Sequence, residues 1–208
     1  MMYRQRIAIL LSSFVLLALA GCGARQPVRG QETSGVDRKL STYAFIEQGE
    51  LATIIVGTRS TRYREATAYI PVEIAIANNG LRQLSLTRES FTLLDEEGNR
   101  YPAVSPRELI EGYDFLDLDR QQLAELQSII FNKFATYTRY PSKFSPTRQF
   151  SSGSSALVRD HVALPKYGYL LDFLYFPAPK TGLLEHRFDL FVTAPELEDP
   201  VFVKFEVK

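Results

Sequence analysis

The residues with the clearest potential for acid–base chemistry are two histidines, each of which follows a carboxylate. They form the pairs Asp160-His161 and Glu185-His186, and the chain has 2 His in total. Histidine titrates near neutral pH, which makes it a common general base and metal ligand. Neighbouring residues on a strand point to opposite faces, however, so a pair in the sequence is not a pair in space. We therefore expect surface or turn histidines here in place of a catalytic or metal site.

A second candidate for chemistry is a group of three aspartates, Asp114, Asp117 and Asp119. Carboxylates bind calcium, but this spacing lacks the Asx-x-Asx-x-Gly frame and the distal glutamate of a calcium loop. Aspartate is also strongly preferred at the N-terminus of a helix. We interpret Asp119, with Gln122 three residues later, as a helix cap, and we predict no metal site.

The stretch from Lys133 to Phe150 combines basic and aromatic side chains, and no acidic residue lies between Glu125 and Asp160. This combination is typical of a surface that contacts an anionic, partly apolar partner: a lipid headgroup layer, a glycan or a nucleic acid. Alternatively, the aromatic residues hold a long loop on the domain and the charges are solvated. The candidate partner-binding residues are Lys133, Tyr137, Arg139, Tyr140, Lys143, Phe144, Arg148 and Phe150.

The elements that must position these residues are mostly short strands. The clearest one spans 70–77, where β-branched residues alternate with smaller or polar ones, so that one face is apolar. The turn residues Asn78-Asn79-Gly80 predict that 81–87 returns as its hairpin partner. The expected strands are 50–57, 70–77, 81–87, 91–94, 100–104, 156–164, 169–176, 187–192 and 201–207. This many short strands separated by turn signals predicts a mainly β protein, an antiparallel sandwich.

Two helices are expected between the strands. Ser105, Pro106 and Glu108 form a capping box with a proline at the first helical position, and Gly112 ends that helix. A longer helix begins near Asp119. Its apolar face is predicted to consist of Leu123, Leu126, Ile130 and Phe134. The rest of the segment, 136–155, has no regular pattern and is expected to be a loop.

Composition indicates one folded domain. The 208 residues include 24 Lys+Arg against 24 Asp+Glu, so no polyanion partner is implied by the overall charge. The 14 Phe and 11 Tyr favour a β-rich core. The chain has 1 Cys, which leaves no disulfide within it.

That cysteine ends a leader-like segment. Arg4 and Arg6 precede an apolar run over 7–19, and the run closes on Leu19-Ala20-Gly21-Cys22. The tetrapeptide resembles the lipobox of bacterial lipoproteins. The resemblance implies that residues 1–21 are removed as a signal peptide and that Cys22 carries covalent lipid, with no other cofactor.

Gly23 after the cysteine resembles the pattern that sorts such proteins to the outer membrane rather than the inner one. The protein is then expected in the cell envelope, facing the periplasm.

The residues after Cys22 contain few large apolar side chains, so 22–41 is expected to be a flexible tether. Its reach is on the order of 25 Å. The lipid would hold the protein at the membrane. A nucleic-acid partner is not expected outside the cytoplasm.

The segments 71–80 and 91–101 resemble the immunoglobulin-like β-sandwich domains that are often appended to bacterial lipoproteins. The likeness lies in an alternating strand, an Asn-Gly turn, and then Phe-x-Leu-x-Asp before a second turn. It covers roughly 50–104 and 156–208, within an expected domain of 42–208. Between 105 and 155 two helices and the basic-aromatic loop replace a short connection. The resemblance implies a binding or assembly role.

These observations predict a lipid-anchored, non-catalytic cell-envelope protein whose sandwich binds or positions another envelope component. No Gly-x-Ser-x-Gly, His-Glu-x-x-His or phosphate-loop motif is present. The alternative is an accessory protein or hydrolase that acts on cell-wall material, with the insertion lining its cleft. A deep pocket that holds Asp160, His161 and another acid would favour the enzyme.

Overall fold

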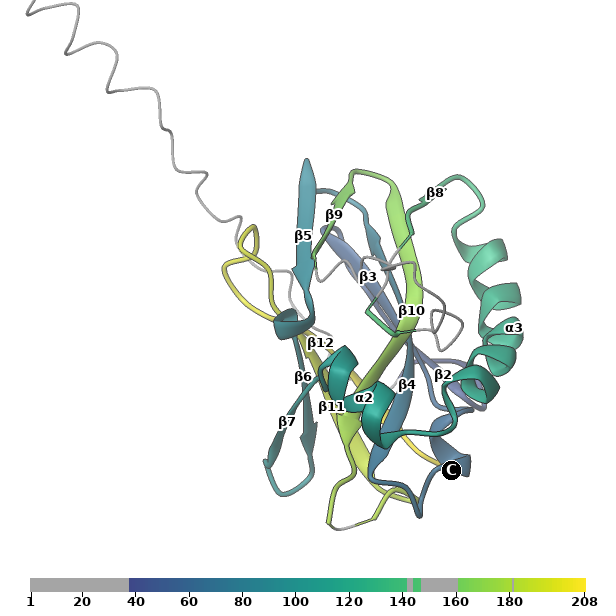
Figure 1. The fold of residues 1–208 in the computed structure, drawn as a ribbon. Coiled ribbons are helices and arrows are strands. Elements are labelled where there is room, and N and C mark those ends of the chain that lie inside the picture. The colour runs from purple at the N-terminus through teal and green to yellow at the C-terminus, as the bar shows by residue number, and fades with distance from the viewer. Residues whose placement is uncertain (1–37, 142–143, 147–160, 181) are drawn as a thin grey trace, which may run out of the picture.

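The protein is a β-sandwich with a layer of helices on one side (Figure 1). The computed structural model describes residues 38–141, 144–146, 161–180 and 182–208. Within these residues the chain forms twelve strands and two α-helices, so the prediction of a mainly β sandwich is confirmed. The expected leader, Cys22 and most of the expected tether lie outside the described residues.

The larger sheet has six strands in the order β1-β2-β3-β4-β10-β8. All of its pairings are antiparallel except the short parallel contact between β10 and β8. Its strands are β1 (Lys39–Ser41), β2 (Ala44–Gln48), β3 (Ala52–Gly57), β4 (Tyr69–Asn78), β8 (Thr138–Arg139) and β10 (Gly168–Pro177). The two longest strands, β4 and β10, pair along their whole length and form the centre of the sheet.

The smaller sheet has four antiparallel strands in the order β12-β11-β6-β7. They are β6 (Phe91–Asp95), β7 (Arg100–Pro102), β11 (Arg187–Val192) and β12 (Val201–Glu206). Two further strands, β5 (Gln83–Thr87) and β9 (His161–Pro165), pair only with each other. Short 3-10 turns precede β4 and β6: η2 (Thr61–Tyr63) and η3 (Arg88–Ser90).

The predicted hairpin between β4 and 81–87 is wrong. Both edges of β4 are already occupied, one by β3 and the other by β10, so no edge is left for β5. The side chain of Asn78 instead redirects the chain. Its amide nitrogen donates to the carbonyls of Leu81 and Leu164, both at 2.9 Å, and its oxygen accepts the Leu81 amide. The chain therefore continues into β5, which pairs with β9 and not with β4.

The main core lies between the two sheets, and β4 is buried on both of its faces. Ile74 and Ile76 belong to the inter-sheet core, whereas Ala75 and Ala77 pack beneath the helical layer. On β12 the predicted alternation is confirmed, because Val201, Val203, Phe205 and Val207 are all buried. A sheet covered on both sides needs apolar residues at consecutive positions, and β4 has them.

The two helices cover the outer face of the larger sheet (Figure 1). The predicted capping box is confirmed in α2 (Pro106–Gly112), where Ser105 and Glu108 exchange their side-chain and backbone bonds. The longer helix, α3 (Leu116–Lys133), begins three residues before the expected start. Its apolar face is confirmed, with Leu126 and Ile130 buried against the sheet. No helix in the described part of the chain has the length and apolarity needed to cross a membrane.

Two strands before residue 50 were not predicted. The first, β1, begins at Lys39, which is inside the range expected for the tether. The second, β2, carries Phe45 in the inter-sheet core and Ile46 under α3. Because its two faces are both covered, β2 lacks the alternation by which a half-buried strand is recognised.

Candidate functional site

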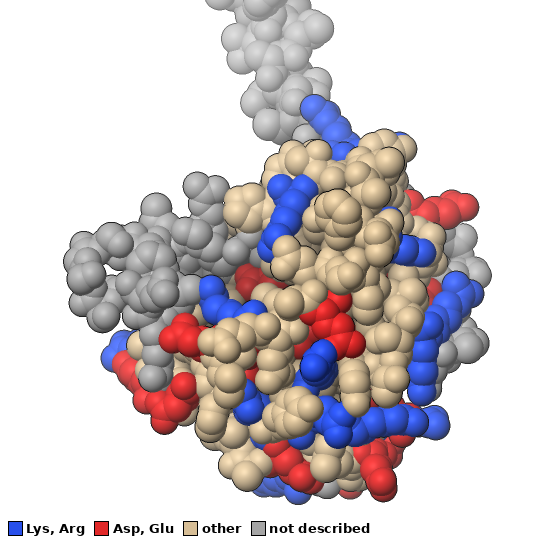
Figure 2. All heavy atoms as spheres, turned by 90° about the vertical axis from the view of Figure 1, so that its right-hand side faces the viewer, with Lys and Arg blue, Asp and Glu red and all other residues tan. Residues whose placement is uncertain are grey.

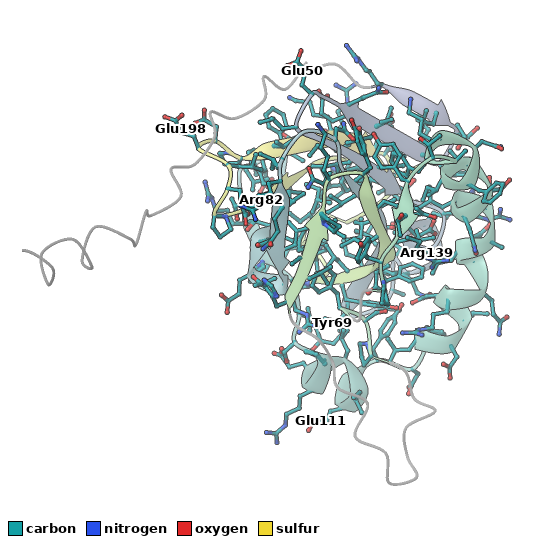
Figure 3. All side chains as sticks on the ribbon, turned by 90° about the horizontal axis from the view of Figure 1, so that it is seen from above. Glu50, Tyr69, Arg82, Glu111, Arg139 and Glu198 are labelled. Atoms are coloured by element: carbon teal, nitrogen blue, oxygen red, sulfur yellow. The ribbon has the colours of Figure 1, made fainter. Side chains whose placement is uncertain are left out.

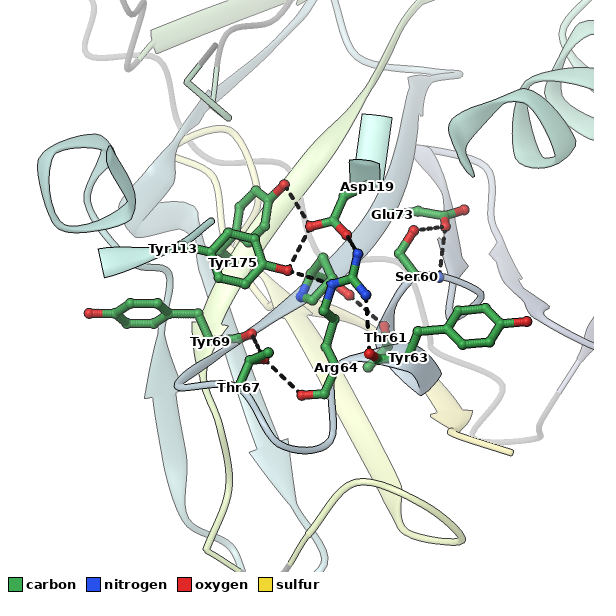
Figure 4. A network of polar contacts seen from close by, with 11 residues as sticks. Ser60, Thr61, Tyr63, Arg64, Thr67, Tyr69, Glu73, Tyr113, Asp119 and Tyr175 are labelled. Carbon is green, nitrogen blue, oxygen red and sulfur yellow. Dashed lines mark hydrogen bonds and ion pairs between the residues drawn. The ribbon is translucent and has the colours of Figure 1, made fainter. Parts of the chain in front are cut away.

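A buried polar network joins the start of α3 to the larger sheet (Figure 4). Asp119 has no exposed side-chain surface, and Arg64, which follows η2, donates from Nη2 to its Oδ1 over 2.6 Å. The Tyr113 hydroxyl donates to Oδ2 of Asp119 over 2.7 Å and accepts from Nε of Arg64 over 3.0 Å. The Tyr175 hydroxyl of β10 lies 3.4 Å from the same Oδ2. These contacts connect η2, α3 and β10.

The interpretation of Asp119 as a helix cap is wrong. The helix begins at Leu116 after Phe115, which makes no side-chain cap, and Asp119 points inward. Asp114 and Asp117 are exposed, so the three aspartates do not converge. Among the described residues no group of three or more His, Cys, Asp or Glu side chains could hold a metal ion. The carboxylate of Asp119 is satisfied by an arginine and tyrosines.

Burial shifts the pKa values of the side chains in this network. It raises the pKa of Asp119 above its ordinary value, while the Tyr113 hydroxyl and the Arg64 guanidinium act against that shift. Burial also raises the pKa of Tyr113 and of Tyr175, and the negative charge of Asp119 adds to both shifts. Both tyrosines therefore stay protonated and can serve as hydrogen-bond donors to the aspartate.

A second buried carboxylate, Glu73, lies on β4 next to this network (Figure 4). Its Oε1 accepts the Ser60 amide at 3.2 Å and the Ser60 hydroxyl at 2.8 Å. Gly57 makes room for it, because a Cβ at that position would lie 2.5 Å from Oε2 of Glu73 and 3.1 Å from Leu126. Burial raises the pKa of Glu73, and the hydrogen bonds from Ser60 and the charge of Arg59 oppose the shift.

A cleft of about 320 Å³ opens between η2 and α3. Arg59 and Glu125 form an ion pair at the cleft, and both side chains are partly exposed. A small void of about 10 Å³ shares this ion pair and reaches Glu73. The cleft is lined by Arg59, Tyr63, Gln121, Gln122, Ala124 and Glu125. On the face of the molecule that carries α3, positive and negative side chains are interspersed (Figure 2).

The predicted basic-aromatic surface is only partly formed. Lys133 is exposed and donates to Oε1 of Gln48, and Arg139 is exposed on β8 (Figure 3). Tyr137 packs on Phe134, and the half-buried Tyr140 packs on the core. Lys143, Arg148 and Phe150 lie outside the described residues. The described aromatic side chains hold the segment against the sandwich, as the simpler alternative predicts.

Phe144 corrects the prediction of a contact surface most directly. Its side chain is 1% exposed and packs edge-on against Phe91 in the inter-sheet core, so it cannot meet a partner at the surface. Asp172 accepts the Phe144 amide at 2.8 Å and the Ser145 hydroxyl at 2.6 Å. Arg120 donates to the Ser145 carbonyl. Residues 144–146 therefore anchor the segment to the sandwich.

The two histidines lie in different surroundings. His161 is exposed at the start of β9 and lines a cavity of about 360 Å³ together with Glu89. Asp160 lies outside the described residues. His186 is half-buried in the turn before β11, where its carbonyl accepts the Val207 amide. The pocket that would favour a hydrolase is therefore untested, and that alternative stays a prediction.

The network around Asp119 was missed at the sequence level, although a signal for it exists. Asp119, Leu123, Leu126 and Ile130 are spaced by four, three and four residues, so the aspartate falls on the apolar face of α3. A carboxylate on such a face is buried and needs a cationic partner. The sequence does not identify Arg64 among its arginines. No protein-family model, curated protein or solved structure matches this chain.

Proposed function

We propose that the chain is a lipid-anchored, non-catalytic cell-envelope protein whose β-sandwich binds or positions another envelope component. The observation that carries this proposal is the run of Leu19-Ala20-Gly21-Cys22 after a short apolar stretch with Arg4 and Arg6 before it. The cysteine is the 1 Cys of the chain. The lipid would be on the Cys22 thiol, and the body would face the periplasm from the outer membrane.

The architecture supports a role in binding. The sandwich is made rigid by cores on both faces of its larger sheet, and a cleft with polar and aromatic side chains opens at the edge of the helical layer. Binding sites are commonly placed on connections that a rigid scaffold holds. The immunoglobulin-like class is part of the proposal and rests on the sequence resemblance.

Lipidation is the part of the proposal that can be tested first. The full chain with its leader is expressed in a bacterial host that is fed a labelled fatty acid. The wild-type chain is expected to incorporate the label, and its N-terminal peptide is expected to begin at an acylated Cys22 by mass spectrometry. Cys22→Ser should lose the label, because serine supplies no thiol. Fractionation of the two membranes then tests the outer-membrane assignment.

A matched control is Ser34→Ala in the expected tether, which should keep both the label and the acylated N-terminus. Label in the Cys22→Ser chain, or a wild-type N-terminus that keeps residues 1–21, would overturn the proposal. Membrane association alone does not decide the question, because an uncleaved apolar leader could also hold the chain at the membrane.

A further inference from the structure

The cleft between η2 and α3 has the wall composition of a small-ligand site. Its volume of about 320 Å³ is at the lower end of the range of about 300–1,000 Å³ for such sites. One wall comes from the connection between β3 and β4, with Arg59 and Tyr63, and the other comes from α3. The buried pair of Arg64 and Asp119 holds the two walls together. The cleft is thus preformed, which reduces the entropy cost of binding.

Tyr63 supplies an aromatic platform in this cleft. The residue is 55% exposed, so its ring is accessible to a ligand. The guanidinium of Arg62 lies 5.2 Å from the centre of the Tyr63 ring and 5.1 Å from that of Tyr43, and it donates to the Tyr43 hydroxyl. The ring is therefore braced on the protein. An electron-rich ring face attracts the weakly positive C–H edge of a ligand.

The opposite wall offers hydrogen-bonding groups. Gln121 and Gln122 present amides, each of which can donate and accept. The Gln122 Oε1 is buried without a hydrogen-bond partner among the described residues, so a ligand donor reaches it only when the half-buried side chain turns toward the cleft. A ligand hydroxyl or amide N–H would then remove the free-energy cost of the unpaired acceptor. The wall therefore favours a ligand rich in donors.

The charge at the cleft decides between ligand classes. Arg59 and Glu125 are paired with each other, so the lining has no net charge. A phosphate or carboxylate ligand needs an excess of cations, and a metal ion or amine needs an excess of carboxylates. A balanced pair flanked by amides instead suits a neutral ligand with many hydroxyl groups. A sugar ring combines these hydroxyls with an apolar C–H face that fits the Tyr63 platform.

We infer that this cleft binds a neutral saccharide unit of an envelope glycan, with the ring on Tyr63 and its hydroxyl or acetamido groups on Gln122 and the Arg59–Glu125 pair. The inference deepens the proposed function by naming the partner class. Binding itself does not depend on Cys22. A failure of lipidation and a failure of glycan binding are therefore separate results.

The test uses the full chain purified in detergent and two neutral probes, tri-N-acetylchitotriose and maltotriose. Saturation-transfer NMR reports which sugar protons contact the protein, and calorimetry gives the dissociation constant. At least one probe is expected to bind with a dissociation constant below about 10 mM. Tyr63→Ala should weaken that binding at least about tenfold, which corresponds to about 1.4 kcal/mol. Gln122→Ala should weaken it less.

The matched control is Tyr167→Ala, because Tyr167 is also an exposed tyrosine, 52% accessible, but lies outside the cleft. This variant should bind as the wild type does. Thermal melts followed by circular dichroism establish that each variant is folded. Three results would overturn the inference: no saturable binding of either sugar, equal binding by the wild type and folded Tyr63→Ala, or displacement of the sugar by inorganic phosphate.

Discussion

The two halves of α3 rest on the same face of the same sheet, and the N-terminal half adds a buried polar network to its apolar contacts. The C-terminal half packs Leu126 and Ile130 in one apolar cluster with Ala75 and Ala77 of β4. The N-terminal half places Asp119 among Arg64, Tyr113 and Tyr175. Gly57 lies at the boundary, where its missing side chain makes room for both Glu73 and Leu126.

The difference indicates separate roles for the two kinds of contact. Packing stabilises the helix on the sheet, and polar contacts set its exact position. Apolar packing gives stability without direction, because dispersion and burial depend weakly on angle. Hydrogen bonds and ion pairs require defined geometry. The cleft that Tyr63 and Gln122 line runs along the middle of α3, from Gln121 to Glu125, directly after the turn that carries Asp119. The directional contacts are therefore found where the distance between η2 and α3 sets the width of a site.

The largest effect is expected from breaking the polar half on one side only. Asp119→Ala leaves the Arg64 guanidinium buried without its carboxylate, and Arg64 is 5% exposed at its side chain. Removal of one partner of a buried ion pair costs about 3–5 kcal/mol. Urea unfolding followed by circular dichroism measures this loss. Asp117→Ala on the same helical turn is the control, and it should cost less than about 1 kcal/mol.

The double variant Arg64→Met with Asp119→Leu sharpens the same comparison. It replaces the ion pair by apolar groups and removes both charges, so most of the stability lost in Asp119→Ala should return. Binding at the cleft should not return with it, because the directional contact is still missing. A double variant as unstable as the single one would mean that the network is needed for folding and not only for position.

The apolar half should respond less strongly. Leu126→Ala removes a side chain that is 2% exposed and leaves a cavity between α3 and the sheet. The expected loss of unfolding free energy is about 2–4 kcal/mol, measured by the same urea titration. Gln127→Ala at the next, exposed position should be nearly neutral. If Leu126→Ala were neutral as well, α3 would not be held by packing, and the contrast between the halves would fail.

The sequence predicts this fold where residues follow one local rule, and it fails where tertiary contacts decide. The capping box at Ser105 and the alternation in β12 are local, and both are confirmed. The pairing of β5 with β9 depends on β10 occupying the edge of β4, which no local pattern states. For the site, the sequence spacing indicates that Asp119 lies on an apolar helical face, but its partner Arg64 lies 55 residues away in the sequence. Likewise, Phe144 was predicted at the surface because the residues that bury and anchor it, Phe91 at its ring and Asp172 at its backbone amide, are distant in the sequence.

The smallest expected effect is the pH dependence of the free energy of unfolding. Burial raises the pKa of Glu73 from its ordinary 4.5, and it also raises that of Asp119, so the folded protein takes up these protons at higher pH than the unfolded chain does. The free energy of unfolding must then fall as the pH rises from about 4.5 through the raised pKa. Glu73→Gln keeps an oxygen for the bonds from Ser60 and removes one titration. It should flatten this part of the curve and raise the stability at pH 7, as measured by urea unfolding at a series of pH values.

Two controls fix the origin of that slope. Glu50→Gln changes an exposed carboxylate at the turn between β2 and β3, and its curve should run parallel to that of the wild type. Ile130→Ala should lower the whole curve without changing its shape, because Ile130 lies in the apolar cluster under α3 and does not line the void that reaches Glu73. If Glu73→Gln kept the full wild-type slope while Ile130→Ala changed it, the pH dependence would belong to helix packing, and the division of α3 into a directional and a non-directional half would be wrong.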